Sequence, residues 1–559
     1  MIRDQLKKDL EKLVGQEVIL EHPGDPNHGD FSTNAAMRLP GNPLENAKKI
    51  LAKWEKPNYI ERVEVVKPGF INFWLSKTTF GKELELALKD GERYGSSKIG
   101  SGKTLVLDHS HPNIAKRFGI GHLRSTIIGQ ALVKTYRFLG WNVVAENFLG
   151  DWGTQFGMII FQIKRKGLNA SDLSIDDLEK IYVEFNKEAE ENKSLREEAK
   201  AWFKKLEDGD SEARGIWEAV KKTSMEEFER IWELLQAKFD YIHPESFFED
   251  KVKEVINEAK EKGIAKEDEG ALVIRLDGFE NPLLLVKSDG ATTYEARDLA
   301  AIKFWTEEFK PDIIAYEVGV EQSLHFQQVF AAADAFQWGN LPHFVHIKHG
   351  LYRSASGKKF STRKGDTVRL EEVLEEAISR AGKLTKDGSD EVAKAVGIGA
   401  VKYFDLMHHH STDIVFDWEK MFLLEGNSAP YLQYTFARTQ SVLRKATSDS
   451  LTRDSENELT SLRDYELQEE EEEDILRTFY KFPEVVEEAA ENYAPNLLCN
   501  FLFELAQKYN AFYNQHRILG NQLASESGKQ DFRLALTAVT GNILKSGLNL
   551  LGIEAPSKM

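Results

Sequence analysis

An apolar run that leads through a glycine-bearing turn into a helix constrains the fold of this chain more than any other feature. The run is Thr104–Leu107, the turn carries Gly119 and Gly121, and apolar residues recur from Ile127 onward. A strand that feeds a helix in this way is the unit with which α/β proteins bind nucleotide phosphates. Glycine lets the backbone approach a ligand closely, and His122 is placed to donate a hydrogen bond from the first helical turn. The unit predicts a nucleotide site at the edge of a parallel sheet.

The same segment argues against a dinucleotide-binding protein. Arg124 stands where the dinucleotide fingerprint has its third glycine. A bulky residue at that position blocks close packing of the helix on the strand. The nucleotide is therefore expected to be something other than NAD.

A second segment, Ser356–Gly365, also has the composition of a phosphate-binding loop. Cations and hydroxyls fill all but one position between Gly357 and Gly365. Such a loop can embrace a polyphosphate, but the glycine spacing is not that of a Walker loop. Taken alone, the segment is slightly better interpreted as a solvated basic loop.

Length, charge and cysteine content limit the class of protein. A chain of 559 residues is too long for one core. No apolar run approaches the ~20 residues that span a bilayer, and the first residues lack a signal-peptide core, so we expect a cytoplasmic protein without a membrane partner. The single cysteine, Cys499, excludes an internal disulfide, and no Cys/His cluster predicts zinc. The net charge of −18 argues against indiscriminate nucleic-acid binding but is compatible with an RNA bound through local basic patches and shape.

Composition predicts a multidomain α/β protein with three parts. Residues 1–95 form a small α+β unit that ends in a linker rich in glycine, serine and lysine. Residues 96–426 are expected to form a Rossmann-like domain with a parallel sheet, which a charged, helical insertion around 160–290 divides. Residues 427–559 are almost continuously amphipathic with few breakers, which is typical of an all-α helical bundle.

The two phosphate-binding segments resemble the signatures of class I aminoacyl-tRNA synthetases, in the form carried by arginyl-tRNA synthetases. The turn resembles the HIGH signature, and Asn113–Lys116 before it and Leu123–Thr126 after it match the arginyl form. Gly119 stands where the signature usually has its first histidine. Lys359–Arg363 resembles the KMSKS loop, with Thr362 in place of its second lysine.

The resemblance implies ATP-dependent attachment of L-arginine to tRNA(Arg) through an arginyl-adenylate, with release of AMP and pyrophosphate. It implies ATP with Mg²⁺ as a substrate, no permanently bound cofactor or zinc, and no metal site of the protein itself; we expect a monomer. In this family a lysine just upstream of the HIGH signature stands in for the lysine missing from the loop, and Lys116 occupies that position. The residues implied to bind ATP and to carry the chemistry are Lys116, Gly119, Gly121, His122, Lys359, Ser361 and Arg363.

A candidate site for the arginine side chain lies further along the chain. Tyr294 and Asp298 are four residues apart and share one face of a predicted helix. A carboxylate beside an aromatic hydroxyl suits a planar guanidinium, although spacing alone favours an ordinary helix in which Asp298 pairs with a lysine. The resemblance places the arginine side chain at this helix. It assigns to arginine binding Asp108 and Asn113 at the backbone end, Glu245 on the guanidinium side, and Tyr294, Asp298 and the adjoining Gln322.

The two ends of the chain resemble the tRNA-binding domains of the same family. Residues 28–34 look like part of the added amino-terminal domain, which contacts the outer corner of tRNA. The carboxyl-terminal bundle looks like the anticodon-binding domain. Most of its aromatic residues are expected in the core, whereas exposed tyrosines beside Arg438 can stack on unpaired bases.

Two alternatives stay open. A class I synthetase for another amino acid would share both signatures but lack the pair Tyr294 and Asp298. A non-catalytic, synthetase-like RNA-binding protein would keep the bundle and lose the nucleotide site.

Overall fold

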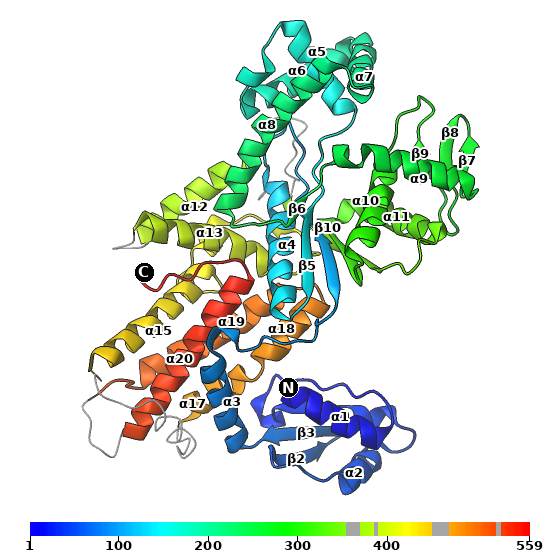
Figure 1. Cartoon of the computed structure of the whole chain (residues 1–559). Coiled ribbons are helices and arrows are strands. Elements are labelled where there is room, and N and C mark those ends of the chain that lie inside the picture. The colour runs from blue at the N-terminus through cyan, green and yellow to red at the C-terminus, as the bar shows by residue number, and fades with distance from the viewer. Residues whose placement is uncertain (354–368, 385–388, 450–468, 521–526) are drawn as a thin grey trace.

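The structure is a computed structural model that describes residues 1–353, 369–384, 389–449, 469–520 and 527–559 (Figure 1). A central sheet lies between a projecting group of helices, a small mixed lobe and a carboxyl-terminal bundle, and the amino-terminal unit lies beside that bundle. The arrangement confirms the predicted fold class.

The amino-terminal unit packs helices against a three-stranded antiparallel sheet of order β1-β3-β2. Asn42 caps the second helix, because its side chain accepts hydrogen bonds from the backbone nitrogens of Leu44 and Glu45. A further helix then leads toward the central sheet. The elements are α1 (Ile2–Val14), β1 (Phe31–Thr33), α2 (Pro43–Lys53), β2 (Ile60–Val66), β3 (Phe70–Leu75) and α3 (Lys77–Asp90).

Five parallel strands form the central sheet, in the order β11-β10-β4-β5-β6. The chain leaves β4 toward β5 and β6 on one side and later fills β10 and β11 on the other, so the strand order reverses between β4 and β10. Ligands of open α/β sheets bind outside the carboxyl ends of the strands at such a reversal. The strands and the first crossover helix are β4 (Thr104–Asp108), α4 (Ile120–Phe138), β5 (Asn142–Asn147), β6 (Tyr241–Ile242), β10 (Ile313–Gly319) and β11 (His343–His349).

Two groups of elements interrupt this sheet. Between β5 and β6 lie the projecting helices α5 (Thr154–Lys166), α6 (Ile175–Glu191), α7 (Ser194–Glu207) and α8 (Ser211–Leu234), at the top of Figure 1. Between β6 and β10 lie α9 (Glu249–Glu261), β7 (Ala265–Asp268), β8 (Ala271–Ile274), β9 (Leu283–Val286) and α10 (Tyr294–Phe309). β7, β8 and β9 form a separate antiparallel sheet, whereas β6, inside the charged segment, joins the central one.

The carboxyl-terminal half is largely helical. A crossover helix joins β10 to β11, two helices follow, and a bundle completes the chain. The elements are α11 (Ser323–Phe336), β12 (Tyr352–Arg353), α12 (Leu370–Leu384), α13 (Asp390–Leu406), β13 (Ile414–Val415), α14 (Trp418–Met421), α15 (Ala429–Asp449), α17 (Glu470–Phe479), α18 (Phe482–Glu491), α19 (Asn496–Gln515) and α20 (Ser527–Leu550). Among the helices described, none is long and apolar enough to cross a membrane.

Arg124, the residue that excludes the dinucleotide fingerprint, fastens α4 to the elements after the central sheet. Its side chain is 1% exposed, Nε donates to Asp405 Oδ1 at 3.3 Å, and Nη1 donates to the Thr412 carbonyl at 2.6 Å. The Tyr352 hydroxyl donates to the other oxygen of Asp405 at 2.5 Å. The bulky residue thus links α4, α13 and β12 through a buried ion pair.

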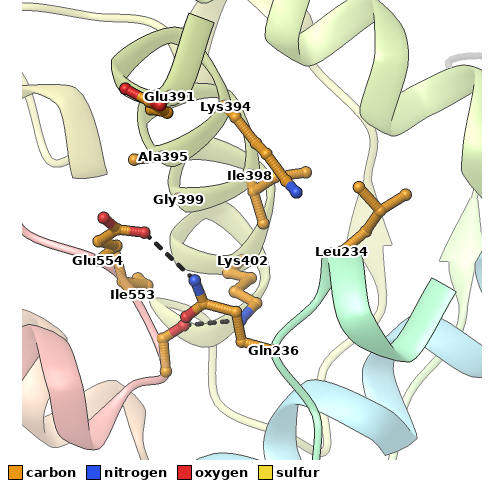
Figure 2. A pocket seen from close by; sticks show the side chains of 11 residues that line it. Leu234, Gln236, Glu391, Lys394, Ala395, Ile398, Gly399, Lys402, Ile553 and Glu554 are labelled. Carbon is orange, nitrogen blue, oxygen red and sulfur yellow. Dashed lines mark hydrogen bonds between the residues drawn. The ribbon is translucent and has the colours of Figure 1, made fainter. Parts of the chain in front are cut away.

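Lys402 joins the catalytic half to the last residues of the chain (Figure 2). Its side chain is 2% exposed, and the ammonium donates to the carbonyls of Leu235, after α8, and of Gly552, after α20. A cavity of about 240 Å³ lies beside it, between α13 and the carboxyl-terminal segment. Burial, with the nearby Lys134, lowers the pKa of Lys402 to about 7.

Replacing Lys402 with Met should make stability less dependent on pH. The folded pKa of about 7 lies below the ordinary 10.5, so the unfolded chain binds this proton more tightly between the two values. The parent therefore gains about 2 kcal/mol of stability from this group between pH 7 and pH 9, and the variant does not. Urea unfolding of both proteins at both pH values measures the difference.

The control for this test is Lys394→Met, which removes an exposed lysine from the same helix. The free energy of unfolding of this variant should change between the two pH values as it does in the parent. An identical pH dependence in the parent and the Lys402→Met variant would contradict the expectation.

Candidate active site

The turn after β4 is held in a conformation that L-residues rarely adopt. Ser110, His111 and Ala115 have φ angles of 86°, 47° and 61°. Hydrogen bonds from two helices fix it: the Ser110 amide donates to Ser125 Oγ of α4 at 2.8 Å, and the Ala115 amide donates to Ser224 Oγ of α8 at 2.8 Å. Strained turns that their surroundings hold in this way cluster at functional sites.

A cavity of about 370 Å³ opens where the strand order of the central sheet reverses. It brings together four of the residues that the resemblance assigns, from two distant parts of the chain: Gly119, Gly121, His122 and Gln322. Sequence reasoning missed other lining residues: Ser110 and His111 shortly after β4, Ser125 on α4, His349 at the end of β11, and Tyr352 on β12. The cavity lies where an open α/β sheet binds its ligand.

His122 presents a neutral imidazole to this cavity. Its Nδ1 accepts a hydrogen bond from the Gly119 amide at 3.2 Å, so the proton of the neutral ring is on Nε2. Burial, together with the charge of Lys116, lowers the pKa of His122 to about 4. The ring can therefore donate from Nε2 to a phosphate oxygen at neutral pH.

Lys116 lies in the same turn, half-buried and close to His122. Its Nζ is 5.1 Å from the ring centroid of Tyr182, which projects from α6. A cation over an aromatic face is attracted by the ring quadrupole, which favours one position of a flexible side chain. Lys359, Ser361 and Arg363, the other predicted contacts of the triphosphate, lie outside the described residues.

Asp108 carries a buried carboxylate oxygen that accepts no hydrogen bond from the described residues, although His111 Nδ1 lies 3.6 Å from it. Its Oδ1 accepts from the Phe148 amide at 2.9 Å, whereas Oδ2 has no hydrogen-bond partner among the residues that the structure describes. Burial raises the pKa of Asp108, and the charge of Glu146 raises it further. A ligand ammonium would satisfy such an oxygen.

Asn113 lies in the turn that follows β4, the strand that ends at Asp108. It contacts the segment that follows β5. Its backbone pairs with Gly150, and a Cβ atom at residue 150 would be 2.4 Å from the Asn113 side-chain oxygen. Glycine at residue 150 therefore makes room for the Asn113 side chain.

Glu245 is buried on a short 3₁₀ turn, Glu245–Phe248, that follows β6. Its Oε2 accepts from the Trp152 amide at 3.2 Å. Burial raises the pKa of Glu245 to about 8, and the charge of Arg297 opposes this rise. Burial and the charge of Glu245 raise the pKa of Tyr294, which places these two predicted residues near each other.

Asp151, in the turn after β5, holds the segment that carries Glu245. One carboxylate oxygen accepts from the Ser246 amide at 2.8 Å, and the other accepts from Ser246 Oγ at 2.7 Å and Lys221 Nζ at 2.8 Å. These hydrogen bonds hold Ser246, the residue after Glu245, against the turn that follows β5.

Asp298 lies one turn after Tyr294 on α10 and is 7% exposed. Its Oδ2 accepts a hydrogen bond from Nε2 of His325, at 2.5 Å. The partner is therefore a histidine on α11 rather than the lysine that spacing alone suggests. Sequence reasoning missed His325, although it follows the predicted Gln322 by three residues.

The described residues thus hold two adjoining regions. One is the cavity with its neutral His122, and the other is an acidic pocket with Asp108, Glu245 and Asp298. The charge of Asp298 contributes to the raised pKa values of both Asp108 and Glu245, so Asp298 lies near both of these carboxyls. Within the ranges described, no group of three His, Cys, Asp or Glu residues could hold a metal ion. A bound organic cation would favour the charged form of these carboxyls, because an opposite charge nearby lowers the pKa of a carboxyl group.

Three family profiles match the chain from end to end. The arginyl tRNA synthetase N terminal domain matches residues 1–75, the class I (R) tRNA synthetase catalytic domain matches residues 83–418, and the DALR anticodon binding domain matches residues 432–559. Arginine–tRNA ligase of Streptococcus uberis is 41% identical over 99% of both chains. Arginine–tRNA ligase of Clostridium perfringens is 38% identical over 100% of this chain and 99% of its own.

Solved structures share the fold. Arginyl-tRNA synthetase of Thermus thermophilus superposes with a TM-score of 0.82 at 24% identity over 100% of both chains. The Plasmodium falciparum enzyme gives 0.82 at 23% identity over 100% of this chain and 99% of its own. With full-length relatives well above 30% identity and a matching catalytic profile, the chain belongs to the arginyl-tRNA synthetases, in class I of the aminoacyl-tRNA synthetases.

Proposed function

We propose that the protein attaches L-arginine to tRNA(Arg) in two steps at this site. A carboxylate oxygen of arginine attacks the α-phosphorus of ATP, and the bond to pyrophosphate breaks. A ribose hydroxyl at the end of the tRNA then attacks the carbonyl carbon of the adenylate, and AMP leaves. The observation that carries the proposal is the acidic pocket beside the cavity at the strand-order reversal.

The first step needs positioning and charge stabilisation more than covalent help from the protein. His122 would donate from Nε2 to the α-phosphate, near the amino end of α4, where backbone N–H groups attract anions. Lys116 would bring the charge that Thr362 does not supply. Lys359, Ser361 and Arg363 would contact the leaving pyrophosphate, and Mg²⁺ would enter with ATP as part of the substrate.

Arginine would bind across the acidic pocket. Oδ2 of Asp108, which accepts no hydrogen bond from the described residues, and the side chain of Asn113 would hold the backbone end. Asp298 and Glu245 would face the guanidinium, beside Tyr294 and Gln322. Because a planar guanidinium forms paired hydrogen bonds with carboxylates, this arrangement favours arginine over lysine.

The parts around the catalytic domain would bind tRNA. We propose that residues 1–95 contact the outer corner of tRNA, that 96–426 carry catalysis, with the insertion around 160–290, and that 427–559 bind the anticodon. We further propose a cytoplasmic monomer. Arg533 donates a hydrogen bond from Nε to Glu472 at 2.8 Å within the bundle, so base contacts are expected from other residues.

Two tyrosines and an arginine form an exposed platform on the bundle. Tyr434 and Tyr513 are 46% and 37% exposed. The Arg438 guanidinium carbon is 5.1 Å from the Tyr434 ring and 4.6 Å from the Tyr513 ring. Asn510 accepts a hydrogen bond from Arg438 at 2.5 Å, which fixes the guanidinium between the rings. Aromatic and guanidinium planes are the groups on which unpaired bases stack.

Replacing Tyr434 with Ala should raise the KM for tRNA by ~10-fold, because loss of one stacking contact costs about 1–3 kcal/mol. The KM for arginine should stay within two-fold. Tyr434→Phe is the matched control, since it keeps the ring and should behave like the parent. Aminoacylation at varied tRNA concentration measures both, and equal losses in the two variants would exclude stacking.

The reaction itself is tested by its products. Purified protein with arginine, MgATP and tRNA(Arg) should form arginyl-tRNA, AMP and pyrophosphate in equal amounts. Release of ADP, or no charged tRNA, would contradict the proposed function.

A further inference from the structure

His325 is a charged group in the arginine pocket with no role in the proposed function so far. We infer that His325 is a positioning residue for arginine recognition: it holds the Asp298 carboxylate in place for the guanidinium and offsets the charge of Glu295. The inference rests on the proposed placement of arginine against Asp298.

The geometry around His325 leaves each ring nitrogen facing a carboxylate of α10. Nε2 is 2.5 Å from Asp298 Oδ2, and Nδ1 is 3.7 Å from Glu295 Oε1. The imidazole packs edge-on against Phe326, with ring centroids 5.1 Å apart. His325 thus ties the first turn of α11, next to Gln322, to the face of α10 that carries Asp298.

The net charge of His325, Asp298 and Glu295 together balances the charge of one substrate cation. Burial alone would lower the pKa of His325, but its hydrogen bond to Asp298 and the nearby carboxylate of Glu295 raise it to about 10. The histidine is therefore protonated at neutral pH, and the three side chains together carry one net negative charge. A guanidinium carries one positive charge, so its binding neutralises the group.

The hydrogen bond also leaves a defined carboxylate oxygen for the substrate. Because Nε2 occupies Oδ2, the torsion of the Asp298 carboxylate is fixed before arginine binds, and Oδ1 remains for the guanidinium. Groups held in their binding geometry avoid the cost of ordering on association. Without His325, Asp298 could rotate and would face Glu295 as an uncompensated like charge.

Two substitutions separate a donor at Nε2 from simple packing. His325→Leu removes the donor and should raise the KM for arginine by ~10-fold or more, with the KM for ATP and kcat within two-fold. In His325→Gln, the side-chain amide nitrogen reaches the place of Nε2, so the KM for arginine should return to within about three-fold of the parent. Thermal melting of each variant checks folding, and His325→Asn, too short to reach Asp298, serves if the leucine variant does not fold.

The matched control is His346→Leu. This histidine packs on the same Phe326 ring, with centroids 4.8 Å apart, and its Nε2 is 3.1 Å from the Val318 carbonyl, away from Asp298. Its KM for arginine should stay within two-fold of the parent.

Asp298→Asn, measured alongside, separates failure of the inference from failure of the proposed function. An unchanged KM for arginine in His325→Leu, with a raised one in Asp298→Asn, would overturn the role of His325 and leave the pocket standing. An unchanged KM in Asp298→Asn would reject the pocket itself. Equal losses in the Leu and Gln variants, or a parallel rise in the KM for ATP, would also overturn the positioning role.

Discussion

Replacing Asp298 with Asn should raise the KM for arginine by ~100-fold or more and leave the KM for ATP nearly unchanged. The amide keeps the shape of the carboxylate and can still accept the hydrogen bond from His325, so the fold should survive. The guanidinium, however, would be desolvated in a buried pocket without its counter-ion, which costs about 3 kcal/mol or more. Steady-state kinetics at varied arginine and varied ATP measure the two constants.

The control for Asp298→Asn is Glu307→Gln, which neutralises an exposed acid of the same helix. Glu307 lies near Lys303, away from the pocket, and its loss should change the KM for arginine less than two-fold. A KM within a few-fold of the parent in Asp298→Asn would exclude this residue from the guanidinium site.

Replacing Lys116 with Ala should slow formation of arginyl-adenylate by ~100-fold or more, with arginine binding nearly unchanged. Lys116 lies in the strained turn, and its charge acts on His122 at the cavity. Loss of one group that stabilises developing charge in the transition state typically costs this much. Single-turnover adenylate formation with the purified variant measures the rate of the step directly.

Lys180→Ala is the control for Lys116→Ala. Lys180 is an exposed lysine of α6, the helix that also carries Tyr182, and it is 3.8 Å from Asp177. The Lys180→Ala substitution should leave the rate of adenylate formation within two-fold of the parent. If Lys116 were an ordinary solvated lysine, its replacement would likewise change adenylate formation less than a few-fold.

The strand–turn–helix unit could be predicted from the sequence because its signals are local. The run Thr104–Leu107 is apolar, and the glycines follow within the same short segment, so β4 and α4 form where the pattern places them. The antiparallel pair β2 and β3 is likewise visible in the alternation of the sequence near residue 68.

Features that depend on distant residues could not be predicted in this way. β6 has only two residues, Tyr241 and Ile242, and it exists because they pair with the end of β5. Arg124 could be recognised as unfit for a dinucleotide site, but its partner Asp405 lies far along the chain.

The residues of the candidate site also fall into those that local signals predict and those that depend on distant parts of the chain. Glycines and a histidine in one turn indicate a phosphate site by local chemistry, whereas Glu245 could be named only through the family resemblance. The pairing of Asp298 with His325 joins α10 and α11, two helices that strand β10 separates along the chain. Spacing along one helix instead suggested a lysine as the partner, because periodicity reports only neighbours on the same helix.

Charging of total tRNA with each of the twenty amino acids in turn tests the central claim most directly. The acidic pocket beside the ATP cavity predicts that arginine alone is attached, and that it is attached to tRNA(Arg). Charging with any other amino acid would contradict the assignment of the pocket, and a protein that binds tRNA without charging it would contradict the proposed catalytic site.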